Sequence, residues 1–231
     1  RIVAVKTLRQ EELGKDDASQ SFMQEAQAVA QLRHPSIVGV HEVGQFRGIQ
    51  YFTMDFIEGL PLDRMLLRDP LEPHRAVEIV LAIAEALQYA HRKGVVHRDL
   101  KPANVILRED GEPVLVDFGI AKQIDPGLQG PTRTGAMIGS PGYWSPEQAS
   151  GSRERIAEQS DVYGLGAILY ACLTARPPFV APSMAELMVM TATQAPEPPS
   201  AFAQVEREIE RICLACLAKE PGQRYASAGA L

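Results

Sequence analysis

Hydrophobic and polar positions follow two different periods along the chain, and the change of period divides it into two parts. Residues 2–6 alternate with a period of two, as a half-buried strand does. Similar runs follow at 37–43 and 49–55, and the glycine at position 48 predicts a turn between them. A helical pattern over 18–33 separates the first strand from the second. The first part is therefore expected to be rich in β-structure.

The second part has the period of helices. Apolar residues recur at helical spacing over 75–92. Residues 161–174 are apolar on nearly every side, which predicts a buried helix. Gly164 and Gly166 each cost such a helix about 1 kcal/mol relative to alanine, so we expect both to mark close packing. Two further helical patterns cover 183–193 and 205–219.

Two short β-branched runs, 105–107 and 114–116, flank the turn dipeptide Asp110-Gly111. A hairpin centred on that dipeptide pairs residues whose numbers sum to 221, so that Asn104 faces Asp117. An amide oxygen beside a carboxylate suits a hard cation such as Mg²⁺. The pattern predicts a metal site at the open end of the hairpin.

Asp99 and Lys101 lie just before Asn104, in the segment that enters the hairpin. A carboxylate there can act on a hydroxyl group, and a lysine can meet a phosphate as a point charge. The alternative is an ordinary polar loop, which the agreement of the other motifs disfavours.

The segment His97-Arg98-Asp99-Leu100-Lys101-Pro102-Ala103-Asn104, followed by Asp117-Phe118-Gly119, resembles the catalytic motifs of protein kinases. From its first residues to its last, the chain resembles bacterial Ser/Thr kinases of the eukaryotic-type (Hanks-type) family. This resemblance implies an α+β, bilobal protein-kinase-like fold. Residues 1–56 would form a small, β-rich, truncated N-lobe, and residues 57–231 a large, mainly α-helical C-lobe.

The resemblance implies that the chain binds ATP with Mg²⁺ or Mn²⁺. Lys6 resembles the lysine that holds the α- and β-phosphates, and Glu25 resembles its helix-borne partner. Met54 resembles the residue at the back of the adenine pocket, although a methionine there is also ordinary core. The nucleotide-binding set implied by the resemblance is completed by Ala4, Asp55, Ile57 and Ile106.

The same resemblance assigns the chemistry. Asn104 and Asp117 would hold the metal, and Asp99 would accept the proton of the substrate hydroxyl or orient it. Lys101 would stabilise charge on the transferred γ-phosphoryl group. His97 is an alternative base, but in this motif it resembles a structural residue that braces the loop.

Three charged residues resemble the anchors of the kinase C-lobe. Asp161 resembles the aspartate that holds the catalytic loop from the central helix. Glu147, in Ser145-Pro146-Glu147, and Arg224 resemble the glutamate and arginine that pair with each other.

Between Asp117 and Glu147 lies a segment of about 30 residues with little periodicity, which resembles the activation segment. Arg98 precedes the catalytic aspartate, as in kinases switched by phosphorylation in this segment. We expect Thr132 or Thr134 to be the phosphorylated residue, with self-association for autophosphorylation; both are otherwise ordinary loop threonines. Ser140 is expected to shape the substrate groove beside Asp99 and Lys101.

The chain departs from the family in one respect, since it contains no G-x-G-x-x-G motif and Lys6 lies near its start. We expect the glycine-rich hairpin to have been lost by truncation. The departure leaves open a second class of function, a non-catalytic kinase-like module that binds a nucleotide or acts as a scaffold. A small-molecule kinase is a third option, against which Gly139-Ser140-Pro141-Gly142 indicates a peptide groove and hence a protein substrate.

Composition narrows the class of protein. A net charge of −6 argues against a nucleic-acid surface. No signal peptide is visible, and the apolar stretch 162–175 is too short to span a bilayer. Three cysteines form no disulfide framework, which favours a cytoplasmic protein or the cytosolic part of a membrane-anchored one. The pair Cys213-x-x-Cys216 is interpreted as core packing rather than a metal or redox site.

Overall fold

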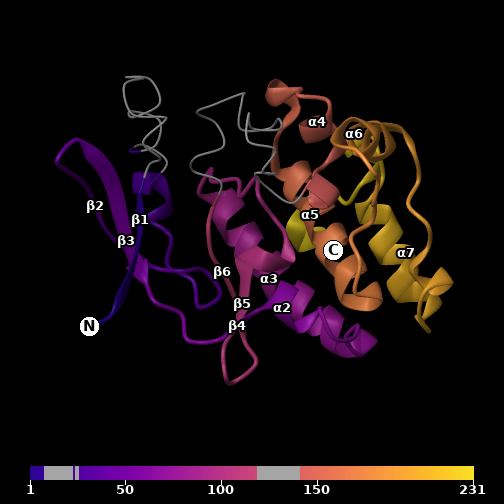
Figure 1. The fold of residues 1–231 in the computed structure, drawn as a ribbon, viewed down its shortest axis with the longest axis horizontal. Helices are drawn as coiled ribbons and strands as arrows, with labels where there is room; N and C mark the ends of the chain where they lie inside the picture. Colours follow the sequence, from indigo (N-terminus) through magenta and orange to yellow (C-terminus); the bar gives the residue numbers. More distant parts are fainter. Residues whose placement is uncertain (8–22, 24–25, 119–140) are drawn as a thin grey trace.

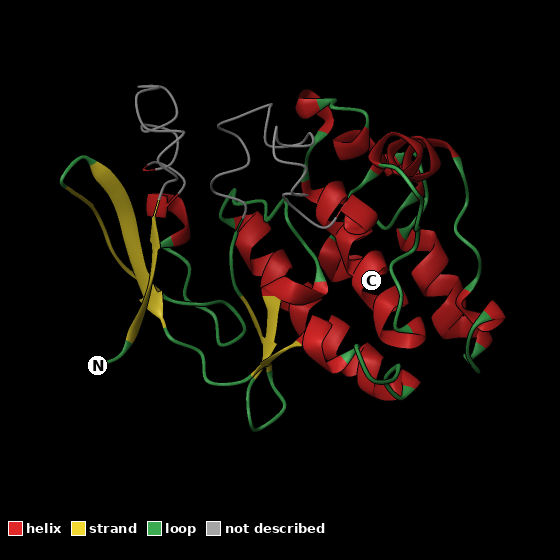
Figure 2. Ribbon diagram, viewed as in Figure 1, coloured by secondary structure: helices red, strands yellow, loops and turns green. Residues whose placement is uncertain are grey.

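The computed structural model describes residues 1–7, 23, 26–118 and 141–231, which form two lobes. A small sheet makes up the N-terminal lobe, and helices make up most of the other (Figures 1 and 2). The bilobal α+β fold expected from the sequence is thus observed. The domain boundary expected after residue 56 stays a prediction.

The N-terminal sheet is antiparallel with the strand order β1-β3-β2. Its strands are β1 (Val3–Thr7), β2 (Val40–Phe46) and β3 (Ile49–Asp55), each within a few residues of the predicted run. Arg47 and Gly48 join β2 to β3 with φ angles of 49° and 84°. A two-residue hairpin turn of type I′ has positive φ at both positions, and its twist matches that of the flanking strands. Of the helix predicted over 18–33, residues 23 and 26–29 are helical among those described.

The C-terminal lobe carries a second small sheet, with the strand order β4-β5-β6. Its strands are β4 (Leu60–Pro61), β5 (Val105–Leu107) and β6 (Pro113–Leu115). The helices are α2 (Leu62–Met65), α3 (Pro73–Arg92), α4 (Pro146–Ala149), α5 (Glu158–Thr174), α6 (Met184–Thr193) and α7 (Arg207–Cys216). Helix α5 lies between α3 and α7 in the helical lobe (Figure 1).

Helix α5 is the core of this lobe, as its apolar sequence predicted. Fifteen consecutive residues, from Ser160 to Thr174, are buried. A Cβ atom on Gly164 would lie 2.6 Å from the Cβ of Leu100, and one on Gly166 would lie 2.5 Å from the Cβ of Cys216. Both glycines therefore mark close packing. The first packs against the loop 97–104, called the catalytic loop after the motif that it resembles, and the second against α7.

The hairpin β5–β6 corrects one expectation. Its paired residues have numbers that sum to 220, so Asn104 lies opposite Val116 and not Asp117. The connection is a five-residue loop in which the Gly111 N–H donates to the Arg108 carbonyl at 2.9 Å. A two-residue turn at Asp110-Gly111 would have set Glu109 directly against Glu112, and two like charges in that position repel. The longer loop avoids this pairing.

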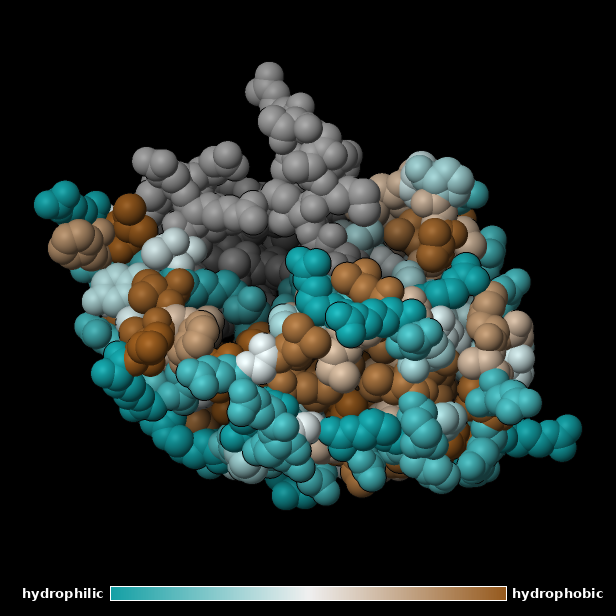
Figure 3. Space-filling model, turned by 60° about the horizontal axis from the view of Figure 1, so that its bottom comes forward, coloured by the Kyte–Doolittle hydropathy of each residue, from teal (hydrophilic) through white to brown (hydrophobic). Residues whose placement is uncertain are grey.

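The surface is mixed. In Figure 3, apolar side chains gather in patches bordered by polar ones on the face that includes the lower side of Figure 1. Leu60 of β4 and Leu67 after α2 are both exposed. Isolated exposed leucines are ordinary on a globular protein.

Candidate active site

The buried carboxylate of Asp161, at the start of α5, holds the catalytic loop in place by hydrogen bonds. Asp161 Oδ2 accepts hydrogen bonds from the His97 N–H at 2.8 Å and from His91 Nε2 at 2.8 Å. Its Oδ1 accepts the Arg98 N–H at 2.9 Å. Arg98 has a φ of 64°, a left-handed conformation that needs such support in a residue other than glycine. The anchoring position predicted for Asp161 is therefore observed.

His97 is fully buried and braces the loop from within. Its Nε2 lies 3.2 Å from the Val116 carbonyl, and its ring lies 4.5 Å from that of Phe118. Burial lowers the pKa of His97, and nearby carboxylates oppose that shift only in part. A buried imidazole with these contacts is a bracing residue and not an exposed base.

Asp99, Lys101 and Asn104 converge as the sequence predicted. The Asn104 side-chain N–H₂ donates to the Asp99 carbonyl at 2.8 Å and to its carboxylate at 3.1 Å. Lys101 Nζ lies 3.2 Å from Asp99 Oδ2. The side chains of Asp99 and Lys101 are only 14% and 15% exposed. The carboxylate is thus oriented by an amide and a cation at the edge of the interlobe region.

Among the described residues, one ion pair joins the two lobes. Lys6 Nζ of β1 donates to Asp117 Oδ1, just after β6, at 2.8 Å. Both side chains are partly exposed, at 30% and 39%, and can reach a ligand from solvent. Asp117 has a φ of 57°, which turns the chain away from the strand direction at this point. The Val116 N–H donates to the Asn104 carbonyl, so Val116 lies opposite Asn104. Asp117 is the next residue, one position beyond this pair.

The donor set fits a hard divalent cation. Asn104 uses its amide nitrogen on Asp99, which leaves the amide oxygen as the available ligand. Asp117 offers a carboxylate, one oxygen of which meets Lys6. Among the described residues no group of three or more His, Cys, Asp or Glu side chains could hold a metal. A site with one carboxylate and one amide is what Mg²⁺ accepts when phosphate oxygens and water supply the other ligands.

The apolar residues expected to surround the nucleotide lie together. Met54, Ile57 and Ile106 are partly buried and pack against one small cluster. That cluster consists of Val38, Val114 and Val116. Ala4 pairs with Met54 across β1 and β3, so it lies beside the same group. Their use in nucleotide binding stays a prediction.

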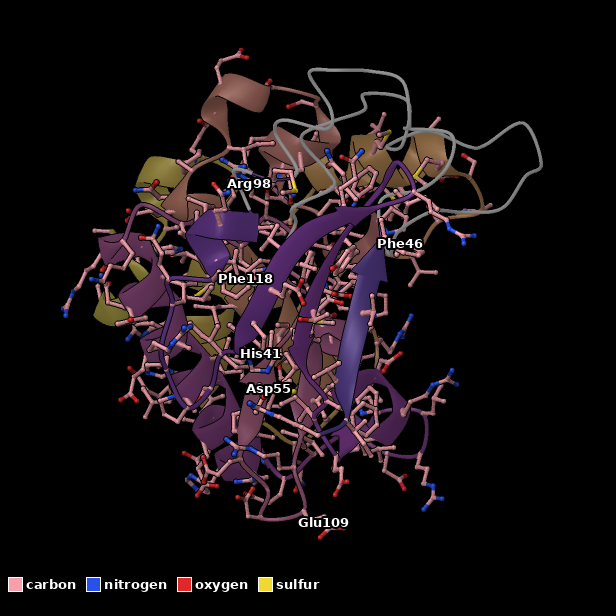
Figure 4. The ribbon with its side chains drawn as sticks, turned by 90° about the vertical axis from the view of Figure 1, so that its left-hand side faces the viewer. His41, Phe46, Asp55, Arg98, Glu109 and Phe118 are labelled. Carbon is pink, nitrogen blue, oxygen red and sulfur yellow. The ribbon has the colours of Figure 1, made fainter. Side chains whose placement is uncertain are left out.

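The Asp55 side chain faces away from this group. Its carboxylate accepts a hydrogen bond from His41 Nε2 at 2.9 Å and another from Arg1 (Figure 4). Burial raises the pKa of Asp55, but the hydrogen bonds from His41 and Arg1 outweigh it and leave the pKa below its ordinary value. The Asp55 N–H also donates to the Gly39 carbonyl at 2.9 Å. Its role in nucleotide binding stays a prediction.

Asp55 also lines a groove of about 1080 Å³. The groove runs between the segments 32–39, 55–58 and 108–110. Its lining does not include Lys6, Asp99 or Asp117. We place the candidate active site at those charged residues and not in this groove, since chemistry depends on converging groups more than on volume.

Glu147 and Arg224 form a bidentate, buried ion pair. The Arg224 nitrogens lie 2.8 and 2.9 Å from the two Glu147 oxygens, and Ser160 Oγ donates to the same carboxylate at 2.6 Å. The pairing predicted for these residues is therefore observed. Four residues with predicted roles, Glu25, Thr132, Thr134 and Ser140, lie outside the described part of the chain.

Comparison with known proteins decides the family. A family model described as protein kinase domain matches residues 1–231. The chain belongs to the protein kinase domain family. This agrees with the resemblance of the catalytic motifs.

Curated kinases from several bacteria are similar to this chain. A probable serine/threonine-protein kinase, SCO3848 of Streptomyces coelicolor, is 41% identical over 99% of this chain and 34% of its own length. The serine/threonine-protein kinase PknB of Mycolicibacterium smegmatis is 38% identical over 99% of this chain and 37% of its own length. The chain thus spans about a third of these relatives.

Solved kinase structures are also similar. The crystal structure of the Mycobacterium tuberculosis PknI kinase domain is 28% identical, with a TM-score of 0.76. The match covers 98% of this chain and 81% of that one. The similarity supports the bilobal kinase fold observed in this chain.

Two residues of this kinase domain escaped the sequence analysis. His91, on the buried face of α3, binds Asp161. Gln148 of α4 donates its side-chain N–H₂ to the Arg98 carbonyl at 2.7 Å. The signal for His91 was a polar residue in the apolar stripe of the 75–92 helix. Gln148 gave no signal, because its partner is 50 residues away.

Within the described ranges, none of the helices combines the length and apolar character needed to cross a bilayer.

Cys213 and Cys216 are buried, and burial raises the pKa of both thiols. Both cysteines pack in the core, as expected.

Proposed function

We propose that the protein containing this chain is a serine/threonine kinase that transfers the γ-phosphoryl group of ATP to hydroxyl groups of protein substrates. The observation that carries the proposal is that two ion pairs, Lys101–Asp99 and Lys6–Asp117, lie near the open end of the hairpin β5–β6. Asp99 is held by Lys101 and Asn104, and the Lys6–Asp117 pair joins the lobes close to the end of the same hairpin. The two curated relatives described above are named as kinases of this class.

The proposed mechanism divides the work among these residues. Lys6 orients the α- and β-phosphates. Asp99 accepts the proton of the substrate hydroxyl or orients the oxygen for in-line attack on the γ-phosphorus. Lys101 stabilises negative charge on the transferred group. The rate enhancement comes mainly from positioning and fixed charges, since little covalent chemistry is asked of the protein.

Asn104 and Asp117 would hold Mg²⁺ through their side-chain oxygens. The bound ion would neutralise charge on the phosphates. The contact between Lys6 and Asp117 shows that both groups reach one point, where a nucleotide tail would separate them.

The proposal includes protein substrates, self-association for autophosphorylation on Thr132 or Thr134, and a cytoplasmic location for this part of the protein. The choice of serine and threonine hydroxyl groups is supported by Lys101, two residues after Asp99. This spacing resembles Ser/Thr kinases more than tyrosine kinases.

The test replaces Asp99 by asparagine in the full-length protein. We expect Asp99→Asn to lower kcat for phosphoryl transfer to a protein substrate by about 10²- to 10⁴-fold, the contribution of a positioned base. ATP affinity, measured by calorimetry, should stay within about twofold, because the phosphate-binding residues are untouched. The matched control is Asp110→Asn in the exposed hairpin loop, which should leave kcat unchanged.

Undiminished transfer by Asp99→Asn would overturn the proposed role of Asp99. If the unsubstituted protein binds ATP without transferring phosphate to itself or to a protein, the non-catalytic module is the correct function.

A further inference from the structure

Helix α6 has an unusual composition for a surface helix. Its ten residues include one charged side chain, Glu186 in the first turn. Only Leu187 and Thr191 are buried. Its position therefore cannot depend on ion pairs of its own, and contacts from neighbouring segments must fix it.

One such contact comes from Lys219, just after α7. Lys219 Nζ donates to the Thr191 carbonyl at 2.8 Å. Thr191 lies in the last turn of α6, where carbonyl groups lack partners within the helix and the dipole favours a cation. Lys219 thus caps α6 from another part of the chain.

The Lys219 ammonium group also lies over two aromatic rings. Nζ lies 4.2 Å from the centroid of Phe179 and 5.9 Å from that of Tyr163. None of the described carboxylates forms an ion pair with it. An ammonium group held by a carbonyl and two ring faces depends on its charge, because attraction to a ring face requires a cation.

The contacts of Lys219 lead toward the end of the activation segment. Helix α6 packs against α4 and against the turn Pro141–Tyr143. A Cβ atom on Gly142 in that turn would lie 3.1 Å from the Phe179 carbonyl and 2.9 Å from the Cβ of Pro177. The segment 177–179 therefore contacts both the Lys219 amine and the turn Pro141–Tyr143.

We propose that Lys219 is a positioning residue for the protein substrate: by capping α6 and resting on Phe179, its ammonium group holds α6 and the turn Pro141–Tyr143 in the arrangement that receives a peptide. The inference rests on the proposed kinase function. It adds a residue remote from the phosphates that acts on peptide binding and not on ATP.

The surroundings of this amine bring its pKa closer to neutral pH. Burial, and then the charge of Arg224, lower the pKa of Lys219 to about 8. Arg224 faces it after α7, with its Nη2 donating to the Lys219 carbonyl at 3.0 Å. From α5 it meets Tyr163, whose pKa burial raises. The contacts from α6 and from Phe179 are uncharged. Lys219 is therefore the group in this cluster expected to titrate between about pH 7 and 9.

The test compares Lys219→Met with Lys219→Arg in the full-length protein. Methionine keeps an apolar stem but loses the charge and the donor. We expect KM for a protein substrate to rise about tenfold in Lys219→Met, the value of one charge-assisted hydrogen bond. The kcat and the KM for ATP should change less than about twofold, and Lys219→Arg should recover most of the loss. Lys93→Met, at an exposed lysine after α3, is the matched control and should change nothing.

A pH series separates positioning from general stabilisation. The ratio of substrate KM between Lys219→Met and the unsubstituted protein should fall as pH rises from about 7 to about 9, because the unsubstituted protein then loses the same charge. A ratio that is constant across this range overturns the proposal, as does an equal loss in kcat and in both KM values. No phosphoryl transfer by the unsubstituted protein would overturn the kinase function itself, and the inference with it.

Discussion

At the scale of single residues, Asp161 determines the shape of the catalytic loop. Its carboxylate is 1% exposed and accepts three hydrogen bonds, from His91, His97 and Arg98. Two of the donors are backbone N–H groups. A buried N–H without a partner costs about 1–3 kcal/mol, so the loss of this side chain cannot be absorbed locally.

We therefore expect Asp161→Ala to lower the free energy of unfolding by about 3–5 kcal/mol, as for removal of one partner from a buried charged network. Urea denaturation followed by circular dichroism measures this value. Asp69→Ala, at an exposed position before α3, is the control and should stay within about 0.5 kcal/mol. An Asp161→Ala protein as stable as this control would show that the loop is held by other contacts.

At the scale of elements, the glycines of α5 show how a helix can place a loop. Gly164 leaves space for Leu100, which lies between Asp99 and Lys101 in sequence. Glycine lowers the helix propensity at this position, but it lets the catalytic loop approach the helix backbone. The sequence showed that glycine lowers the helix propensity here, and the structure shows that the contact with Leu100 requires it.

We predict that Gly164→Ala destabilises the protein by about 1–3 kcal/mol, the usual cost of overpacking, although alanine favours the helix by about 1 kcal/mol. It should also lower kcat, because the displaced Leu100 carries Asp99 with it. Thermal unfolding and a transfer assay measure the two effects. Gly222→Ala provides the comparison, since a Cβ there meets no atom within 4 Å. A stabilised Gly164→Ala protein would contradict the packing argument.

The hairpin β5–β6 shows the limit of sequence reasoning for an element. The two strands were predicted at 105–107 and 114–116, and the structure has them at Val105–Leu107 and Pro113–Leu115. The register was wrong by one residue, because the Asp110-Gly111 dipeptide can serve either a two-residue or a five-residue loop. Contacts outside the hairpin favour the longer loop, including the one from Arg75 Nη2 to the Gly111 carbonyl at 2.5 Å.

At the scale of the whole molecule, the Glu147–Arg224 pair ties α4, after the activation segment, to the C-terminal part of the chain. The two residues are 77 positions apart, and their side chains are 2% and 0% exposed. Burial raises the pKa of Glu147, but hydrogen bonds from Arg224 and Ser160 outweigh it, so the pKa lies below its ordinary value. The stability from this pair is therefore complete above the unfolded-state pKa and is lost as pH falls through the folded-state pKa.

We expect the unsubstituted protein to lose stability more steeply than Glu147→Gln as pH falls below about 4.5. At neutral pH, Arg224→Met should cost about 3–5 kcal/mol, because it leaves a buried carboxylate without its partner. The exposed pair Arg155–Glu220, at 3.2 Å, offers a control, since Arg155→Met should cost less than about 1 kcal/mol. Denaturation curves across the pH range measure both effects. Parallel pH profiles for the unsubstituted protein and Glu147→Gln would contradict this account.

The sequence by itself determined the family, the lobes and the residues of the candidate site, because those features depend on local period and on motif spacing. Hydrophobic period showed where strands and helices lie, and the two catalytic motifs indicated Asp99, Lys101, Asn104 and Asp117. Only the tertiary structure decided the hairpin register, the second anchor at His91 and the cap that Lys219 places on α6. Each of these depends on contacts between segments far apart in the chain, and such contacts leave no periodic signal in a single sequence.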